Sequence, residues 1–429
     1  MAPSLAVSLI QADVLPNFPP EICSLVEGYL DQSDLLSLRQ MNRRLRHYLQ
    51  EKWLEAFFRK WTHVFSYHGL STLLQIVARP EMAKRLKSIE FRVLDFPEPG
   101  KDPRRDTEAE TARMAMNAAW EMQELRLRRG GCGARKLKKI FTALVRHGVV
   151  IPVTIDDDCL EANERILRTA FGRKVLTTMG GDPERYLLWR EHDRGSCDEV
   201  GCAVMTAIAA TQYPVENLRF PCRLSNVGIG RLTLGLESSI SKACSTALSN
   251  LSSLDLTLDP HMFFDERNDW TGNVFHLRSL PALQHLRLSL AHPACADASP
   301  RGLTRMMNCF PMKQIRTLVL GNTYGEPKDY ISMLAKAKHS LRKLRLVAFD
   351  VLFGGCWSTI FRWLGQNLEL ADLWLEDVGH PMLGLYVCRG AAEANAHECN
   401  HFIGAAVVRD GLRSLVDRPG YAFPSKPEA

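Results

Sequence analysis

The 429-residue chain lacks the features that mark membrane proteins, secreted proteins and the common nucleotide-binding and hydrolase classes. No run of eighteen apolar residues occurs, which argues against a membrane-spanning helix. The apolar patch from Leu5 to Ile10 has no Lys or Arg before it, so we expect no secretory signal. The sequence also contains no phosphate-binding P-loop, no paired-glycine dinucleotide fingerprint and no G-x-S-x-G nucleophile turn. Catalysis therefore has no convincing place in this chain, and we expect neither a cofactor nor a membrane partner.

Paired cysteines and a strong excess of one charge are missing as well. The twelve cysteines are scattered without a Cys-x-x-Cys pair, which is the pattern of reduced and mostly buried thiols. We therefore expect a cytoplasmic or nuclear protein. The net charge of +6 is small for this length, so it indicates acidic partners only weakly, and we do not expect nucleic acid as a partner. The length suffices for a small module plus one extended or two compact domains.

One short motif points to a metal. His397-Glu398-Cys399-Asn400-His401 matches H-E-x-x-H, which on a helix turns two imidazoles to one side to hold zinc while the glutamate activates water. Val407 stands where the longer form of the motif needs a third His, and the chain beyond it is too short for the rest of a zinc protease. We keep a zinc protease as the least favoured alternative and expect no metal.

A run of carboxylates follows one of the apolar segments. Asp156, Asp157 and Asp158 precede Glu161 and Glu164, a grouping that attracts cations. It has neither a glycine turn nor an ordered series of oxygen ligands, so we predict a solvated cap for the next helix instead of a cation site.

A basic cluster surrounds Gly130-Gly131. Its members are Arg126, Arg128, Arg129, Arg135, Lys136, Lys138 and Lys139. Leucines flank the cluster, which favours the exposed face of a repeated structural unit; a nuclear-import or phosphate-binding patch is the alternative.

The segment from Phe18 to Leu54 carries three short amphipathic helical patterns with almost no loop between them. Pro19 and Pro20 can start the first helix, because proline fixes φ near the helical value and the first turn leaves its amides unpaired. Ser33-Asp34 can cap the second helix. Three helices of this length cannot enclose a core in under about 40 residues. The segment therefore needs another polypeptide to cover its apolar side.

These residues resemble an F-box, in the form common among filamentous-fungal F-box proteins. The resemblance rests on Phe18-Pro19-Pro20-Glu21-Ile22 and on the apolar positions that follow up to Leu45, with Phe18 where the family usually has Leu. The segment from His63 to Phe91 is similar to what often follows the F-box in that group. The resemblance implies binding to the Skp-type adaptor of cullin-RING ubiquitin ligases. The residues that we assign to the adaptor contact or its support are Phe18, Pro19, Pro20, Ile22, Val26, Leu30, Leu35, Leu38 and Leu45.

An ordinary helical subdomain packed on its own protein is the alternative for this segment.

Beyond this region a pattern of three apolar residues returns, with two residues between the first pair and one between the second. Its clear copies are Ile229-Leu232-Leu234, Leu251-Leu254-Leu256, Leu283-Leu286-Leu288, Ile315-Leu318-Leu320, Leu341-Leu344-Leu346 and Leu370-Leu373-Leu375. We attribute weaker copies ending at Phe91, Leu127, Ile155 and Phe220 to chance. Helical stripes alternate with the copies, for example at 137–145, 240–248 and 357–364, and Gly148 is a plausible C-terminal cap. Each unit is thus a helix followed by a short strand, and neighbouring units must stack to cover their apolar faces.

This array looks like a degenerate set of leucine-rich repeats. Regular arrays place Asn or Cys three residues after the last leucine, where its side chain bonds the backbone of adjacent coils. Here those positions hold Asp259, Ala291, Thr323, Phe349 and Val378. We therefore expect uneven coils with insertions such as 259–271. An ordinary α/β domain with buried strands is the alternative.

The sequence thus predicts an α/β protein in which a three-helix F-box precedes an irregular leucine-rich-repeat-like solenoid. The expected segments are a flexible N-terminus (1–14), the F-box-like module (15–66), connecting helices and linker (67–112), the repeat-like region (113–390) and a C-terminal tail segment (391–429). We expect a non-catalytic, substrate-recognition subunit of a Skp-cullin-F-box ubiquitin ligase, whose partners are the adaptor, through it a cullin, and an unidentified target protein. An F-box scaffold outside ubiquitination is the alternative.

Overall fold

The computed structural model describes nine continuous parts of the chain and a few single residues. The continuous parts are 60–93, 131–157, 196–222, 228–259, 279–291, 309–351, 357–380, 385–388 and 400–416. The single residues lie at 37, 40, 46, 47, 50, 51, 54, 122, 126, 127 and 277.

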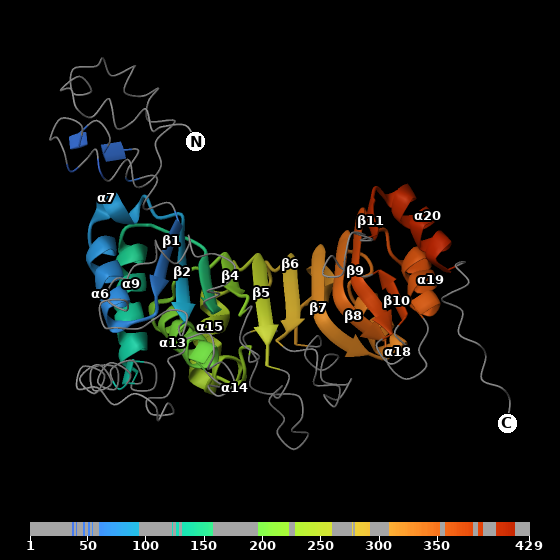
Figure 1. Ribbon diagram of the computed structural model, residues 1–429. Coiled ribbons are helices and arrows are strands. Elements are labelled where there is room, and N and C mark those ends of the chain that lie inside the picture. The colour runs from blue at the N-terminus through green and yellow to red at the C-terminus, as the bar shows by residue number, and fades with distance from the viewer. Residues whose placement is uncertain are drawn as a thin grey trace, which may run out of the picture.

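Eleven strands within these parts form one mixed sheet, and its order follows the chain (Figure 1). The first nine strands run parallel to one another, and each pairs with its neighbours in chain order. These strands are β1 (Lys60–Val64), β2 (Ser88–Val93), β3 (Val153–Asp157), β4 (Asn217–Phe220), β5 (Ser253–Leu258), β6 (His285–Leu290), β7 (Thr317–Gly325), β8 (Lys343–Val351) and β9 (Asp372–His380). The predicted α/β class is confirmed, and the sheet is mostly parallel.

Two antiparallel strands complete the C-terminal edge. β11 (Asn400–Ile403) pairs with the first half of β9, and β10 (Leu385–Cys388) pairs with its second half. The sheet therefore runs from β1, within the predicted F-box-like module, to β11 in the predicted C-terminal segment.

Most of the described helices connect parallel strands, and the last one follows β11. Their bounds are α6 (Tyr67–Val77), α7 (Pro80–Ala83), α9 (Cys132–Arg146), α13 (Ser196–Thr211), α14 (Arg231–Leu234), α15 (Ser238–Ala247), α18 (Pro327–Ala335), α19 (Trp357–Asn367) and α20 (Ala405–Val416), with the 3-10 helix η5 (Met312–Gln314) before β7. Parallel neighbours need a crossover, and crossovers are right-handed. Because the strand order never reverses from β1 to β9, these crossovers place their helices on the same face of the sheet. Consecutive helices pack on one another, as α9 does on α6 and α13. No helix among the described residues is long and apolar enough to cross a bilayer.

The predicted leucines form two buried rows across the sheet. Residues 254, 286, 318, 344 and 373 are in register, and so are residues 256, 288, 320, 346 and 375. Every one of these ten leucines is buried. Alternate residues of a strand face the same side, so both rows point toward the helices. Burial of each leucine contributes about 2 kcal/mol to the hydrophobic term. Five of the six clear copies of the motif are confirmed as strands.

The first clear copy is not a strand. Ile229 makes only an isolated bridge to Leu258, and the next residues form helix α14. The carboxylate of Asp198, from α13, accepts hydrogen bonds from the amides of Leu232 and Thr233 at 3.0 and 2.9 Å. These bonds satisfy two of the amides that a helix start leaves unpaired. A partner 34 residues earlier in the chain therefore decides the local structure.

The weaker copies of the motif were largely misjudged. Those ending at Phe91, Ile155 and Phe220 form β2, β3 and β4, with all three residues buried. The copy ending at Leu127 is not a strand, because 122, 126 and 127 are helical. Apart from Leu218 in β4, these three strands bury Ile, Val and Phe where the later strands bury Leu, and these residues suit a strand equally well.

The end of the motif departs from the regular asparagine arrangement, as the sequence indicated. β7, β8 and β9 continue through Thr323, Phe349 and Val378, which are in register. One residue earlier, the side-chain amide of Asn322 donates to the Leu290 carbonyl at 3.1 Å. Asn322 lies at φ 50°, a left-handed conformation that asparagine tolerates.

The predicted C-terminal cap of α9 is confirmed. Gly148 lies at φ 66°, its amide donates to the Val145 carbonyl at 3.0 Å, and the amide of Val149 donates to the Leu144 carbonyl at 2.9 Å. This pair of bonds is the Schellman arrangement, in which glycine avoids the cost of a side chain at positive φ. The helix therefore ends where the sequence places its end.

A histidine buried in β1 gives the fold a testable pH dependence. Burial lowers the pKa of His63 from 6.5 to about 3, partly opposed by the backbone of Gly69. Between these pH values the unfolded chain takes up a proton that the folded chain excludes, so stability falls as pH falls. Through this histidine, the wild type should lose about 2 kcal/mol of unfolding free energy when the pH falls from about 7 to about 5. The variant His63→Phe should lack this contribution. Urea unfolding at both pH values measures it, and parallel pH profiles for both proteins would contradict this assignment.

Candidate functional site

The nine residues predicted to contact the adaptor lie outside the described residues. They are Phe18, Pro19, Pro20, Ile22, Val26, Leu30, Leu35, Leu38 and Leu45. The structure does describe the end of the third predicted helix. Leu54 is buried in the main core, and Glu51 forms an ion pair with Arg85 just after α7. This helix end therefore contacts the same body as the sheet.

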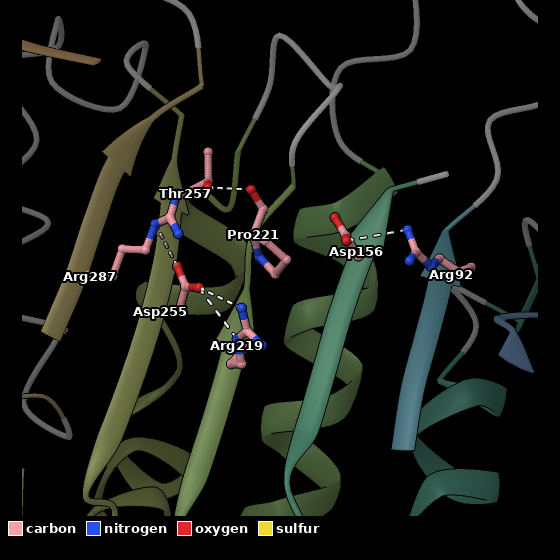
Figure 2. A network of polar contacts seen from close by, with 7 residues as sticks. All are labelled: Arg92, Asp156, Arg219, Pro221, Asp255, Thr257 and Arg287. Atoms are coloured by element: carbon pink, nitrogen blue, oxygen red, sulfur yellow. Dashed lines mark hydrogen bonds and ion pairs between the residues drawn. The ribbon is translucent and has the colours of Figure 1, made fainter. Parts of the chain in front are cut away.

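The sheet has a second face on which polar side chains alternate with the buried leucines. Figure 2 shows part of this face, from Arg92 on β2 to Arg287 on β6, with the labelled side chains in front and helices behind the sheet. One row of this polar face is in register across nine strands. Its members are Thr62, Glu90, Thr154, Arg219, Asp255, Arg287, Val319, Arg345 and Trp374. Strands lie about 4.8 Å apart, so each of these side chains is beside the next.

The polar face is buried at its N-terminal end. Arg92 pairs with Glu90 on its own strand and with Asp156 on β3, where Nη1 and Oδ2 are 3.3 Å apart (Figure 2). The exposed fractions of these side chains are only 13%, 6% and 5% for Arg92, Glu90 and Asp156. The prediction that Asp156 caps a helix in solvent is therefore wrong. Asp156 belongs to β3 and compensates the charge of a neighbouring strand.

The middle of the polar face is more open. Asp255 lies between Arg219 and Arg287, and its carboxylate is 3.4 Å from the nearest nitrogens of Arg219 and 3.7 Å from Nε of Arg287 (Figure 2). About half of each arginine side chain is exposed, while Asp255 is 9% exposed. Beside this group, the hydroxyl of Thr257 donates to the carbonyl of Pro221. Exposed pairs of this kind contribute about 0–1 kcal/mol each, so they shape the surface more than they stabilise the fold.

The C-terminal end of the polar face carries an aromatic residue among charges. Trp374 donates from Nε1 to Oε2 of Glu376 at 3.0 Å, and the same oxygen accepts from Nη2 of Arg345 at 2.7 Å. The Arg345 guanidinium lies 4.7 Å from the centre of the Trp374 ring, and the His401 ring lies 4.5 Å from it. Asp372 holds His401 through a 3.0 Å contact to Nε2. We call these five residues the Trp374 cluster.

The Trp374 cluster has the composition of a protein contact. Tryptophan and arginine are the residues most enriched among the strong contacts of protein interfaces. Arg345 and Trp374 occupy the single position between the last two leucines of the motif, and their side chains are partly exposed. The sequence analysis treated that position only as a spacer. The signal that was available is that this position holds polar or aromatic residues on most strands of the array.

The H-E-x-x-H motif does not form the helix that a zinc site needs. Asn400 and His401 belong to β11, and His401 pairs with Asp372, while 397–399 lie outside the described residues. Among the residues that the structure describes, no group of three His, Cys, Asp or Glu side chains is placed to hold a metal.

Two of the described thiols, Cys202 and Cys244, are poorly suited to nucleophilic chemistry. Within the described parts, Cys197, Cys222, Cys244 and Cys309 are buried. Burial raises the pKa of Cys244 to about 12, and it raises the pKa of Cys202 as well. A thiol reacts as its thiolate, which these pKa values disfavour near neutral pH.

Neither a protein-family model nor a curated protein matches the chain. The functional assignment therefore rests on the chain's own sequence and structure.

Proposed function

We propose that this protein is the substrate-recognition subunit of a Skp-cullin-F-box ubiquitin ligase. The observation that carries the proposal is the F-box-like run from Phe18 to Leu45, with its proline pair and its ordered apolar positions. That run is too short to cover its own apolar residues, so it needs a second polypeptide. In the proposed complex this polypeptide is the Skp-type adaptor.

We further propose that the rest of the chain is an irregular solenoid of the leucine-rich-repeat type. Three observations support this: the strands follow one another in chain order, their leucines stack in register, and helices join them. The strands range from four residues in β4 to nine in β7, which is why the array counts as irregular. Such an array exposes a broad surface on its strand side.

The target protein, in this proposal, binds the polar face of the sheet. The middle and the C-terminal end of that face supply half-exposed arginines and Trp374, side chains that suit a protein partner. The C-terminal Trp374 cluster is the strongest candidate anchor, because its aromatic ring is held by contacts on both sides.

The proposed mechanism is proximity, and the chain supplies no acid, base or nucleophile. Holding adaptor and target on one chain raises the effective concentration of target lysines at the ubiquitin-charged enzyme that the cullin recruits.

Capture of the tagged full-length chain from cells tests this function. We expect the adaptor and a cullin to copurify with it, since the adaptor bridges the two. Adaptor without any cullin would contradict the ligase function and favour an F-box scaffold outside ubiquitination. If neither the adaptor nor a cullin copurifies, both the ligase function and the scaffold function are contradicted.

A further inference from the structure

A hollow with a basic lining lies between α6 and α9, away from the polar face of the sheet. Its volume is about 530 Å³. Arg135, Lys138, Lys139 and Arg146 of α9 line it, and all four are exposed. Apolar Leu74, Ala78 and Ala143 complete much of its wall. We call this hollow the basic groove.

The packing of α9 fixes these cations at the groove. Residues 135, 138, 139, 142 and 146 follow the three- and four-residue steps of one helical face, whereas Leu137, Ile140 and Leu144 are buried on the opposite face. Lys136 is the exception within the basic cluster. Its Nζ bonds the Ser71 hydroxyl at 2.6 Å and lies 3.6 Å from the centre of the Tyr67 ring. The predicted basic cluster is thus split: three of its members line the groove, and Arg146 joins them.

The charge of the basic groove is not balanced locally. Neither α6 nor α9 contains an Asp or Glu residue, and the described residues that line the groove include none. Among the described residues none of the four cations forms an ion pair, whereas Arg219, Arg287 and Arg345 on the polar face each do. A partner with carboxylates could therefore pair with these four cations without first breaking an ion pair within the described part of the protein.

We propose that the basic groove binds an acidic amphipathic helix of a partner protein. From Arg135 to Arg146 the groove face of α9 extends about 16 Å, which is three turns of a bound helix. Carboxylates three and four residues apart on that helix match the spacing of the cations, and its apolar side chains meet Leu74, Ala78 and Ala143.

Other anionic partners fit the groove less well. Single-stranded nucleic acid favours aromatic side chains on which bases stack, but His147 is the only ring among the described residues that line the groove, and Lys136 covers Tyr67. A membrane surface favours protruding Trp, Phe and Leu side chains, which this hollow does not offer.

Fluorescence anisotropy with the full-length chain tests the proposal, and the adaptor is added if the chain is stable only with it. The probe is a labelled peptide of about 18 residues with glutamates on one helical face and leucines on the other. We expect saturable binding that weakens as salt rises from about 50 to about 300 mM. Lys138→Glu combined with Lys139→Glu should weaken binding by about tenfold or more.

A matched control reverses two exposed cations on another helix pair, with Arg362→Glu on α19 and Arg409→Glu on α20. We expect this control to bind as the wild type does. If the groove variant does not fold, Lys138→Gln with Lys139→Gln removes the charges instead and should still weaken binding several-fold. Absence of saturable binding, or equal losses in groove and control variants, would overturn the proposal. So would tighter binding of a DNA duplex or of phosphatidylserine vesicles than of the peptide.

This inference stands apart from the proposed ligase function. Loss of the adaptor contact leaves α6 and α9 intact, so peptide binding should persist in a chain that no longer captures the adaptor. The two proposals can therefore fail separately.

Discussion

Replacing Arg92 by methionine should lower the free energy of unfolding by about 3–5 kcal/mol, because it leaves two buried carboxylates without their positive partner. Glu90 and Asp156 both pair with this guanidinium and are almost fully buried. Methionine keeps much of the volume but none of the charge. Urea unfolding of the full-length chain, followed by circular dichroism, measures the effect.

The polar face supplies a matched control in Arg219→Met. Arg219 also pairs with a carboxylate on the neighbouring strand, but it is 45% exposed and Arg287 stays beside Asp255. We expect a loss of about 0–1 kcal/mol for this variant. Equal losses of unfolding free energy for the two variants would show that burial does not determine how much the Arg92 ion pairs stabilise the fold.

Changing Pro19, Pro20 and Leu35 together to alanine should abolish capture of the Skp-type adaptor. In the proposed complex the prolines start the first helix, and Leu35 contacts the adaptor or directly supports that contact. Central interface side chains each contribute about 2 kcal/mol or more, so the triple change should weaken binding by at least about a hundredfold. Pulldown of purified adaptor by the tagged chain measures the loss.

The control for this experiment is Trp374→Ala, which changes the proposed target-binding surface at the far end of the sheet. We expect that variant to capture the adaptor as the wild type does. If the triple variant also captures it undiminished, the assignment of the adaptor contact is wrong.

Much of the sheet follows from sequence periodicity alone. The leucines of β5 to β9 recur with a spacing of two within each strand, and burial of one face requires that pattern. The helical faces of α9 and α15 were predictable for the same reason, since their apolar residues recur at three- and four-residue steps.

The remaining features depend on partners far apart in the chain. Asp156 is buried because Arg92, 64 residues earlier, lies on the adjacent strand. Helix α14 forms because Asp198 reaches its first amides from α13. His401 belongs to a strand because β9 offers it a pairing edge. None of these contacts leaves a local signature in the sequence, so local patterns gave the wrong structure or none at all.

The candidate site divides in the same way. The sequence singled out the proposed adaptor residues because their order carries a resemblance, and these lie outside the described residues. The Trp374 cluster was missed, because the positions of Arg345 and Trp374 were treated as spacers and no strand was expected at β11, which brings His401 to the cluster.

Calorimetric titration of purified full-length chain with the Skp-type adaptor of the same organism tests the central claim most directly. The account predicts a one-to-one complex with submicromolar affinity and a negative heat-capacity change, the mark of apolar surface being covered. A folded, monomeric chain that releases no binding heat at several temperatures, and that elutes separately from the adaptor, would contradict it.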